Sequence, residues 1–196
     1  MRIIAGELRG RAIEAPEGRG TRPMLDRVRE AIFSTLAPWI PEGFVLDLFA
    51  GSGSLSFEAL SRGARAARAI ERDPRAFGIL ESNAEQLGVE DRLECVRGDA
   101  FDPLRWRGMA ADVVFLDPPY PWLKEASKRK VIFGGVQGLL EEALAPDGVI
   151  VFHAPRGAVT AAEFGEGVEV AERNYGTNAI WYVGRETEET DVDASE

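Results

Sequence analysis

The chain has 196 residues, of which 45% are apolar and 29% charged, and its net charge at pH 7 is −10. This composition is typical of soluble globular domains and excludes a chain that is mainly disordered, collagen-like or coiled coil. One cysteine, one histidine and no apolar run near the roughly 18 residues of a membrane span exclude an internal disulfide, a Cys/His metal cluster and a membrane helix, so we expect a cytoplasmic protein.

Residues 1–40 predict a small N-terminal extension. Residues 1–22 alternate crudely between apolar and polar side chains on both sides of a turn, which predicts two short strands in a hairpin. From Asp26 to Leu36 apolar residues recur at helical spacing, and the prolines that follow end this predicted helix.

Residues 41–185 alternate between predicted strands and helices. Apolar segments predict strands at 44–48, 66–70, 93–96, 112–117 and 148–153, and a closing hairpin at 168–174 and 179–184. Helices are predicted at 54–62, 74–87 and 136–145. Continuous apolar strands between helices are typical of a parallel sheet covered on both faces. We therefore predict an α/β fold with a seven-stranded, mostly parallel sheet, to which the hairpin adds antiparallel strands at one edge.

Charged residues are unevenly distributed along the chain. Residues 186–196 carry six carboxylates and no base, which predicts a disordered acidic tail; removing these six charges from −10 leaves −4 for the rest. Residues 1–29 carry seven arginines against four acids, and all three lysines lie within 124–130. Because local basic patches set the attraction to phosphates, the overall negative charge does not exclude a nucleic-acid partner.

A glycine-containing turn follows the first strand of the alternating region. Gly51-Ser52-Gly53 permits a sharp turn and a close approach of a ligand to the backbone. Ser56 occupies the position of the third glycine in the dinucleotide fingerprint, and no nucleotide-binding P-loop is present. By itself the motif is also compatible with an ordinary turn between a strand and a helix.

Three acids are expected at the same edge of the sheet. Glu71 ends the second strand, 20 residues after Gly51, where a carboxylate can accept both hydroxyls of a ribose. Asp99 follows the third strand and could accept an adenine amino group, and Asp47 would face the amino-acid end of a cofactor. Singly, each acid is as often a surface or capping residue. Together with the turn, the three acids predict an adenosine site.

The motif Asp117-Pro118-Pro119-Tyr120 follows the fourth strand and carries the predicted chemistry. The prolines fix the backbone, so the Asp117 carboxylate and the Pro118 carbonyl point into the crevice at the strand ends. Two convergent acceptors suit a planar amino group, and Tyr120 offers a ring on which a base can stack. The alternative is a polyproline turn that only ends the strand.

These motifs resemble the S-adenosylmethionine-dependent amino-methyltransferases. More narrowly, the runs Arg2–Gly6, Arg22–Glu30 and Tyr175-Gly176 resemble the bacterial RsmD family, whose members methylate the exocyclic N2 of a guanine in 16S ribosomal RNA. The resemblance extends from residue 2 to about residue 184 and implies a Rossmann-like class I methyltransferase fold. Met24 and Leu25 depart from the family, in which hydroxyl-bearing residues are usual there.

The resemblance implies roles for individual residues. Those implied to hold the acceptor amino group are Asp117, Pro118, Pro119 and Tyr120. Those implied to bind the cofactor are Asp47, Phe49, Ala50, Gly51, Ser52, Gly53, Glu71, Arg72, Asp99 and Ala100. We expect S-adenosylmethionine as cofactor, S-adenosylhomocysteine as product and no metal ion.

The basic segments are predicted to hold the backbone of 16S rRNA within a small-subunit particle, with residues 1–40 covering the site and the chain acting as a monomer. The predicted RNA contacts are Arg9, Arg11, Arg22, Arg29, Lys124, Lys128, Arg129 and Lys130, the last four in a loop. Cys95, on an expected interior strand, and His153 are interpreted as structural residues.

Other functions share parts of this pattern. An N6-adenine DNA methyltransferase or a protein glutamine methyltransferase would use the same cofactor site and the same amino-group clamp. A nicotinamide-dependent oxidoreductase is disfavoured by the missing third glycine and by the Asp-Pro-Pro-Tyr motif. A non-catalytic RNA-binding module would retain the basic segments without methyl transfer.

Overall fold

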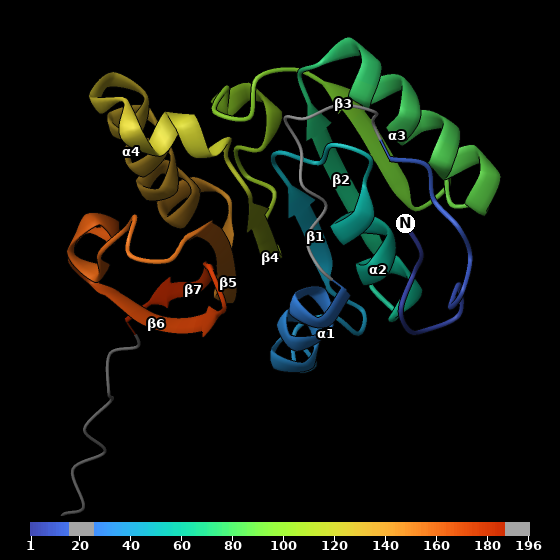
Figure 1. Cartoon of the computed structure of the whole chain (residues 1–196), viewed down its shortest axis with the longest axis horizontal. Helices are drawn as coiled ribbons and strands as arrows, with labels where there is room; N and C mark the ends of the chain where they lie inside the picture. Colours follow the sequence, from blue (N-terminus) through green and yellow to red (C-terminus); the bar gives the residue numbers. More distant parts are fainter. Residues whose placement is uncertain (16–25, 187–196) are drawn as a thin grey trace, which may run out of the picture.

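A computed structural model of the chain describes residues 1–15 and 26–186 (Figure 1). In this part of the chain seven strands form one sheet in the order β3-β2-β1-β4-β5-β7-β6. The five strands β1 to β5 are parallel, and β7 pairs antiparallel with β5 and β6. The strands are β1 (Phe44–Asp47), β2 (Ala66–Glu71), β3 (Leu93–Arg97), β4 (Ala111–Leu116), β5 (Leu144–Pro155), β6 (Val168–Tyr175) and β7 (Asn178–Arg185). The predicted fold class is confirmed.

Four α-helices and three 3-10 helices connect these strands within the described residues. The sequence explains their ends: α3, for example, begins after Asp73, whose carboxylate accepts from the backbone N–H groups of Arg75 and Ala76, and ends at the left-handed Gly88. The helices are α1 (Asp26–Thr35), α2 (Ser54–Ser61), α3 (Pro74–Leu87), α4 (Ala126–Glu142), η1 (Pro103–Arg105), η2 (Tyr120–Lys124) and η3 (Ala161–Phe164).

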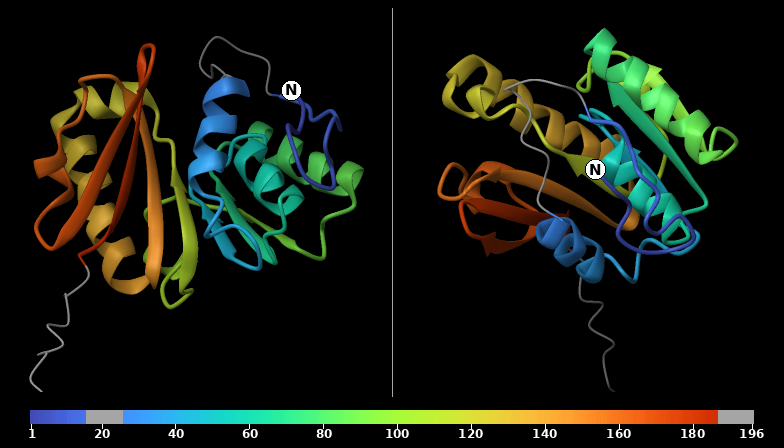
Figure 2. Two further views of the ribbon diagram at one scale, coloured as in Figure 1. Left: turned by 90° about the horizontal axis from the view of Figure 1, so that it is seen from below. Right: turned by 45° about the vertical axis from the view of Figure 1, so that its right-hand side comes forward.

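Two hydrophobic cores lie on opposite faces of the sheet. Alternate strand residues such as Val45 and Phe115 pack with α1, α2 and α3, whereas Leu46 and Leu116 pack with α4. The right-hand view of Figure 2 shows α1 and α4 on opposite sides of the strands. Because helices cover both faces of the sheet, the parallel strands carry apolar residues on both faces.

The N-terminal segment is held against α2 by a buried carboxylate. Glu58 is fully buried and accepts from the backbone N–H groups of Ile4 and Ala5 at 2.7 and 3.0 Å and from Arg62 Nε at 2.7 Å. Gly6, with a φ of +83°, passes so close to α2 that a Cβ would lie 1.7 Å from the Ser61 carbonyl oxygen. The predicted hairpin is reduced in residues 1–15 to one antiparallel bridge, Arg2 with Ala12. The N–H groups of Ile4, Ala5, Glu7 and Leu8 bond to Glu58 and Ser61 of α2 and not across the hairpin.

Several boundaries differ from the predictions. The segment predicted as a basic loop consists of η2 and the first turns of α4, which starts ten residues before the predicted helix. Glycine residues obscured the helical pattern in the sequence. At Gly135 a Cβ would lie 2.2 Å from the Phe101 ring, so this buried helix position has room only for glycine and does not contribute an apolar residue to the pattern. Cys95 lies on β3, which is an edge strand and not an interior one, and it is partly buried against the core.

Some expectations stay predictions. Arg22, Met24 and Leu25 lie in residues 16–25 and most of the acidic tail in 187–196, outside the described residues. The division into an extension at 1–40 and a methyltransferase domain at 41–185 is likewise untested. Among the helices of residues 1–15 and 26–186, none has the length and apolar character to cross a membrane.

Replacing Glu58 by alanine is expected to cost about 3–5 kcal/mol of the free energy of unfolding, because the Ile4 and Ala5 N–H groups and the buried Arg29 lose a partner. Urea unfolding monitored by circular dichroism measures this. The matched control is Glu94→Ala: that carboxylate is 58% exposed in its pair with Arg68, so its loss should cost no more than about 1 kcal/mol. Equal losses of unfolding free energy in the two variants would contradict the role of the buried Glu58 in holding the N-terminal segment.

Candidate active site at the carboxyl edge of the sheet

The direction of chain progression reverses between β1 and β4, which are neighbours in the sheet. In open α/β sheets, ligands bind in the crevice outside the carboxyl ends of the strands at such a point. Asp47 is the last residue of β1 and is paired with Phe115, while Asp117 follows the last residue of β4. The fold therefore brings these two carboxylates to the same edge of the sheet, where a ligand crevice is expected.

The glycine-containing turn is tied to the end of β2 by Glu71. Its carboxylate accepts from the Gly51 N–H at 2.9 Å and from the Asp73 N–H at 2.7 Å. Gly53 precedes α2 with a φ of 84°, and a Cβ there would lie 2.5 Å from side-chain atoms of Leu80 and Phe57. The turn therefore requires glycine both for its backbone conformation and for its packing.

Asp47 is buried beside this turn, with a relative exposure of 3%. Burial raises the pKa of Asp47 to about 7, and the charges of Asp117 and Glu71 contribute to this rise, while a 2.7 Å hydrogen bond from the Ser56 hydroxyl opposes it. Ser56 is the residue at the position of the missing third glycine. The departure from the dinucleotide pattern therefore supplies the hydrogen-bond donor that Asp47 uses.

Asp99 and Arg72 lie next to an aromatic cluster. Asp99 accepts from the Phe101 N–H at 2.9 Å and lies 3.8 Å from Arg72 Nη1. The Arg72 guanidinium lies 5.4 Å from the centre of the Trp122 ring, and Lys128 Nζ lies 4.9 Å from it. The same ring makes an edge contact with Phe49, which in turn contacts Phe101. Ala50, Ser52 and Ala100 are buried close to these residues along the chain.

Asp117 is held by a chain of hydrogen bonds that begins at His153. Leu116 pairs with Phe152, which places Asp117 beside His153 on β5. His153 Nδ1 lies 2.9 Å from Asp117 Oδ1, and Nε2 lies 3.2 Å from the Tyr120 hydroxyl. That hydroxyl donates to Asn178 Oδ1 at 3.0 Å. Pro118 is buried, whereas Pro119 and Tyr120 are exposed.

The interpretation of His153 as a structural residue stays a prediction, but the structure places it in contact with the motif. It is 6% exposed, and both of its ring nitrogens contact residues of the Asp-Pro-Pro-Tyr motif. Burial lowers the pKa of His153, but the Asp117 charge and the hydrogen bonds to Asp117 and Asn178 outweigh it, so the pKa is raised above its ordinary value. Its position at the end of a buried strand next to Asp117 was the signal in the sequence.

Two of the predicted RNA contacts have protein partners: the prediction for Arg29 was wrong because this side chain is fully buried, whereas that for the partly exposed Arg129 stays a prediction. Arg29 is fully buried, donates to the Arg2 carbonyl and pairs with Asp26 at 3.0 Å. Arg129 donates to both carboxylate oxygens of Glu163 and to the carbonyl oxygens of Leu123 and Ala158. Both guanidinium groups therefore stabilise the fold.

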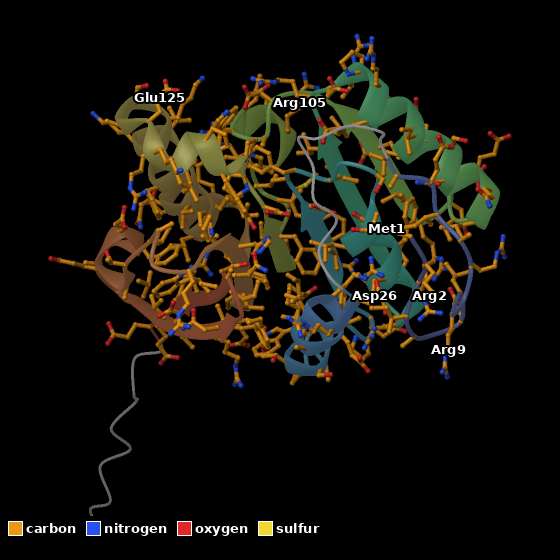
Figure 3. All side chains as sticks on the ribbon, in the orientation of Figure 1. Met1, Arg2, Arg9, Asp26, Arg105 and Glu125 are labelled. Carbon is orange, nitrogen blue, oxygen red and sulfur yellow. The ribbon has the colours of Figure 1, made fainter. Side chains whose placement is uncertain are left out.

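Arg9 and Arg11 lie at the other end of the sheet, so the prediction that they flank the site was also wrong. The backbone next to Arg9 bonds to Ser61, at the carboxyl end of α2, and Arg11 donates to the Gln86 carbonyl near the end of α3. These helices run antiparallel to the strands and end at the amino edge of the sheet. Figure 3 shows Arg9 and Glu125, the residue before α4, on opposite sides of the molecule.

Lys124 and Lys130 are exposed, and Lys128 is partly buried on Trp122.

The sequence pattern did not identify Trp122, Asn178, Arg27 and Arg156 as residues of this edge. Arg27 lies next to the β6–β7 turn, since a Cβ added to Gly176 would be 3.8 Å from Arg27 Nη2. Arg156 is joined to the same turn by a hydrogen bond from its backbone N–H to the Thr177 carbonyl oxygen. The antiparallel order of β7 brings this turn to the carboxyl edge. Within the described ranges, no group of three or more His, Cys, Asp or Glu residues could hold a metal ion.

Comparisons with known proteins agree with this fold and sequence pattern. A family model described as conserved hypothetical protein 95 matches residues 1–184. The protein YlbH of Bacillus subtilis is 35% identical over 185 residues, which cover 92% of this chain and 96% of YlbH. The ribosomal RNA small subunit methyltransferase D of Escherichia coli (strain K12) is 42% identical over 120 residues, which cover 61% of this chain and 60% of that protein.

Solved structures share the fold over most of the chain. The Escherichia coli protein yhhF matches with a TM-score of 0.79 and 31% identity over 95% of this chain and 98% of its own. An RNA methyltransferase from Salinibacter ruber, solved in complex with S-adenosyl-L-homocysteine, matches with a TM-score of 0.59 over 89% of this chain and 100% of its own. At 20% identity, this second likeness shows the fold alone.

Replacing Asp47 by asparagine is expected to stabilise the protein at alkaline pH. The folded pKa of about 7 lies above the roughly 3.9 of an unfolded aspartate, so stability is lost as the pH rises from about 4 through 7. The melting temperature of Asp47→Asn should exceed that of the parent at pH 8.5, by about 2–4 °C for each kcal/mol, and this gain should shrink at pH 5. The exposed Asp91→Asn serves as control; a pH-independent gain at Asp47 would contradict the assignment.

Proposed function

The chain belongs to the RsmD family, and we propose that it transfers a methyl group from S-adenosylmethionine to the exocyclic N2 amino group of a guanine in 16S rRNA. The observation that carries this proposal is the position of Asp117 directly after β4, beside Asp47 and the glycine-containing turn of β1. An amino-group clamp and a cofactor cradle then share one crevice. The name of the Escherichia coli relative supports ribosomal RNA of the small subunit as the substrate.

The electrostatics of the crevice favour a positively charged ligand. Asp47, Glu71 and Asp117 converge there, and the charges of the last two help to raise the pKa of Asp47. The ammonium and sulfonium groups of S-adenosylmethionine would offset this repulsion, so the residues fit this cofactor. Asp47 would face its amino-acid end, Glu71 its ribose and Asp99 its adenine, while residues 51–53 allow close approach. When bound, the sulfonium supplies an electrophilic methyl group.

The chain's own contribution is positioning and electrostatics. The guanine amino group is a poor nucleophile because its lone pair is delocalised into the ring. Two hydrogen bonds, to the Asp117 carboxylate and the Pro118 carbonyl, would favour a pyramidal nitrogen and stabilise its developing positive charge. Tyr120, 38% exposed, offers its ring for stacking, which is worth about 1–3 kcal/mol per base.

The target base must leave its stack to reach the crevice. Exposed cations around the carboxyl edge, among them Lys124, Arg27 and Arg156, would contact the RNA backbone there. We further propose that a monomer acts on a small-subunit particle, which offers the folded RNA that such a dispersed set of cations requires.

Asp117→Ala is expected to lower methyl transfer about 100-fold or more while leaving cofactor affinity nearly intact, because the contact forms with the acceptor. Glu71→Ala is expected to weaken cofactor binding roughly 10- to 100-fold, because charged hydrogen bonds to the ribose are lost. Tritiated methyl transfer to small-subunit particles from a strain that lacks the enzyme, followed by mapping of the base, and calorimetry of S-adenosylmethionine measure both effects.

Other outcomes of this assay identify the alternatives. Labelling of DNA adenine or of protein glutamine, with no label in rRNA, would assign the same site to another acceptor. Unchanged cellular rRNA methylation in Asp117→Ala would favour a non-catalytic module. Nicotinamide binding without S-adenosylmethionine binding would indicate an oxidoreductase. Equal losses of cofactor affinity in Asp117→Ala and Glu71→Ala would contradict the separate roles given to these two residues.

Replacing Lys124 and Lys130 together by alanine is expected to weaken RNA binding and to reduce the slope of log affinity against log salt by about 1 for each phosphate that the protein no longer neutralises. Filter binding between low and moderate salt measures the slope. The double variant Arg9→Ala/Arg11→Ala removes the same charge at the amino edge of the sheet and is the matched control. Equal slopes for the two double variants would refute an RNA surface at the carboxyl edge.

A further inference from the structure

We propose that His153 is a positioning residue for the transfer, and that in its protonated form it fixes the Asp117 carboxylate and the Tyr120 ring. The inference rests on the proposed function, because it assigns His153 to the orientation of the groups that would hold the acceptor base. It goes beyond that function by naming a residue, and a charge state, on which the geometry of the clamp depends.

His153 connects four separate segments of the chain. From β5, its two ring nitrogens reach Asp117 after β4 and Tyr120 at the start of η2, and the tyrosine hydroxyl continues to Asn178 at the start of β7. The imidazole and the Tyr120 ring also meet edge to face, with centroids 5.8 Å apart. A histidine that served packing alone would not direct both nitrogens at the first and last residues of one four-residue motif.

Counting protons along this chain of hydrogen bonds defines the charge of the imidazole. An ionised Asp117 only accepts, so the contact at 2.9 Å requires a hydrogen on Nδ1. The single hydroxyl hydrogen of Tyr120 is donated to Asn178 Oδ1, so the contact at 3.2 Å requires a second hydrogen on Nε2. With Asn178 Oδ1 as the acceptor of the Tyr120 hydrogen, an imidazolium satisfies all of these hydrogen bonds together, whereas a neutral ring protonated on Nδ1 alone leaves the contact between Nε2 and Tyr120 without a proton.

The surroundings of His153 support this charge state. Among the described residues, the titratable groups that contact it are Asp117 and Tyr120, and the charge of Asp117 in turn acts on Asp47 of β1. Burial lowers the pKa of His153, and the Asp117 charge with the hydrogen bonds to Asp117 and Asn178 raises it further than burial lowers it. The nearest negative charge thus stabilises the imidazolium, and no positive charge contributes to the shift.

The consequence for the acceptor is geometric. With Oδ1 bound to His153, the Asp117 carboxylate cannot rotate freely, and Oδ2 is the oxygen that would accept the amino N–H. The imidazolium–carboxylate pair is neutral as a unit, which limits the repulsion between Asp117 and the two other acids of the crevice. His153 therefore orients an ionised Asp117. Asp117 Oδ2, which would accept the amino N–H, is the atom placed to take the proton that the nitrogen loses when its bond to the methyl carbon forms, and His153 does not receive that proton.

Nuclear magnetic resonance can test the charge directly, because His153 is the one histidine of the chain. We expect its imidazole signals to titrate above the ordinary range of histidine, with both nitrogens protonated at pH 7, and Asp117→Asn to lower the pKa. A neutral imidazole at pH 7 would overturn the proposal. This readout needs no methyl transfer, so it decides the matter even where the proposed function fails.

Kinetics test the positioning role. His153→Ala should lower kcat roughly 10- to 100-fold with little change in the KM for S-adenosylmethionine, because one charged hydrogen bond to Asp117 is lost. His153→Asn keeps an N–H near the Nδ1 position and should recover most of kcat. The parent kcat should fall as alkaline pH removes the imidazolium proton, and His153→Asn should lose this decline.

Matched variants complete the test. Asn178→Ala should move the alkaline decline to lower pH, since it removes a hydrogen bond that raises the pKa of His153. Thr177→Ala, an exposed neighbour in the same turn, should leave rate and profile unchanged. An active parent whose rate and pH profile survive His153→Ala would overturn the inference alone, whereas a parent that labels no RNA would overturn the proposed function.

Discussion

Mutual repulsion among three carboxylates at one strand edge is the constraint around which this site is organised. Parallel pairing of β1 with β2 and β4 brings Asp47, Glu71 and Asp117 together, and each is accommodated differently. Asp47 is buried and holds a proton up to a pH of about 7 beside the Ser56 hydroxyl. Glu71 accepts two backbone N–H groups, and Asp117 pairs with His153. Each device lowers the cost of like charges in one crevice before any ligand enters.

The N-terminal segment shows how the fold supports the same edge from a distance. Asn83 on α3 donates to the carbonyl oxygens of both Glu14 and Ser52 and accepts from the Glu14 N–H. One buried amide therefore joins the N-terminal segment to the glycine-containing turn. Because Glu58 anchors this segment at its other end, the packing of residues 1–15 and the shape of the turn are mechanically linked.

Local patterns predicted most of the fold, whereas side-chain partners could not be predicted. Strand and helix positions follow from apolar periodicity, and the seven strands predicted within residues 41–185 are all present, whereas the N-terminal hairpin is reduced to one bridge. The partners of Arg29, Arg129 and His153 were missed for one physical reason. Apart from Asp26 beside Arg29, their charged partners lie far along the chain, at Glu58, Glu163 and Asp117. A charge in a sequence does not show whether tertiary structure has already neutralised it.

The pairing with His153 also explains why a carboxylate suits position 117 in this chain. An asparagine there would have one acceptor oxygen and one amide donor group. With its oxygen turned to His153, the amide N–H groups would face the N–H groups of the incoming base, and two donors would oppose each other. A carboxylate can accept on both sides at once. His153 and Asp117 are therefore chemically matched. While His153 donates to one carboxylate oxygen of Asp117, the other oxygen remains available to accept the N–H of the base.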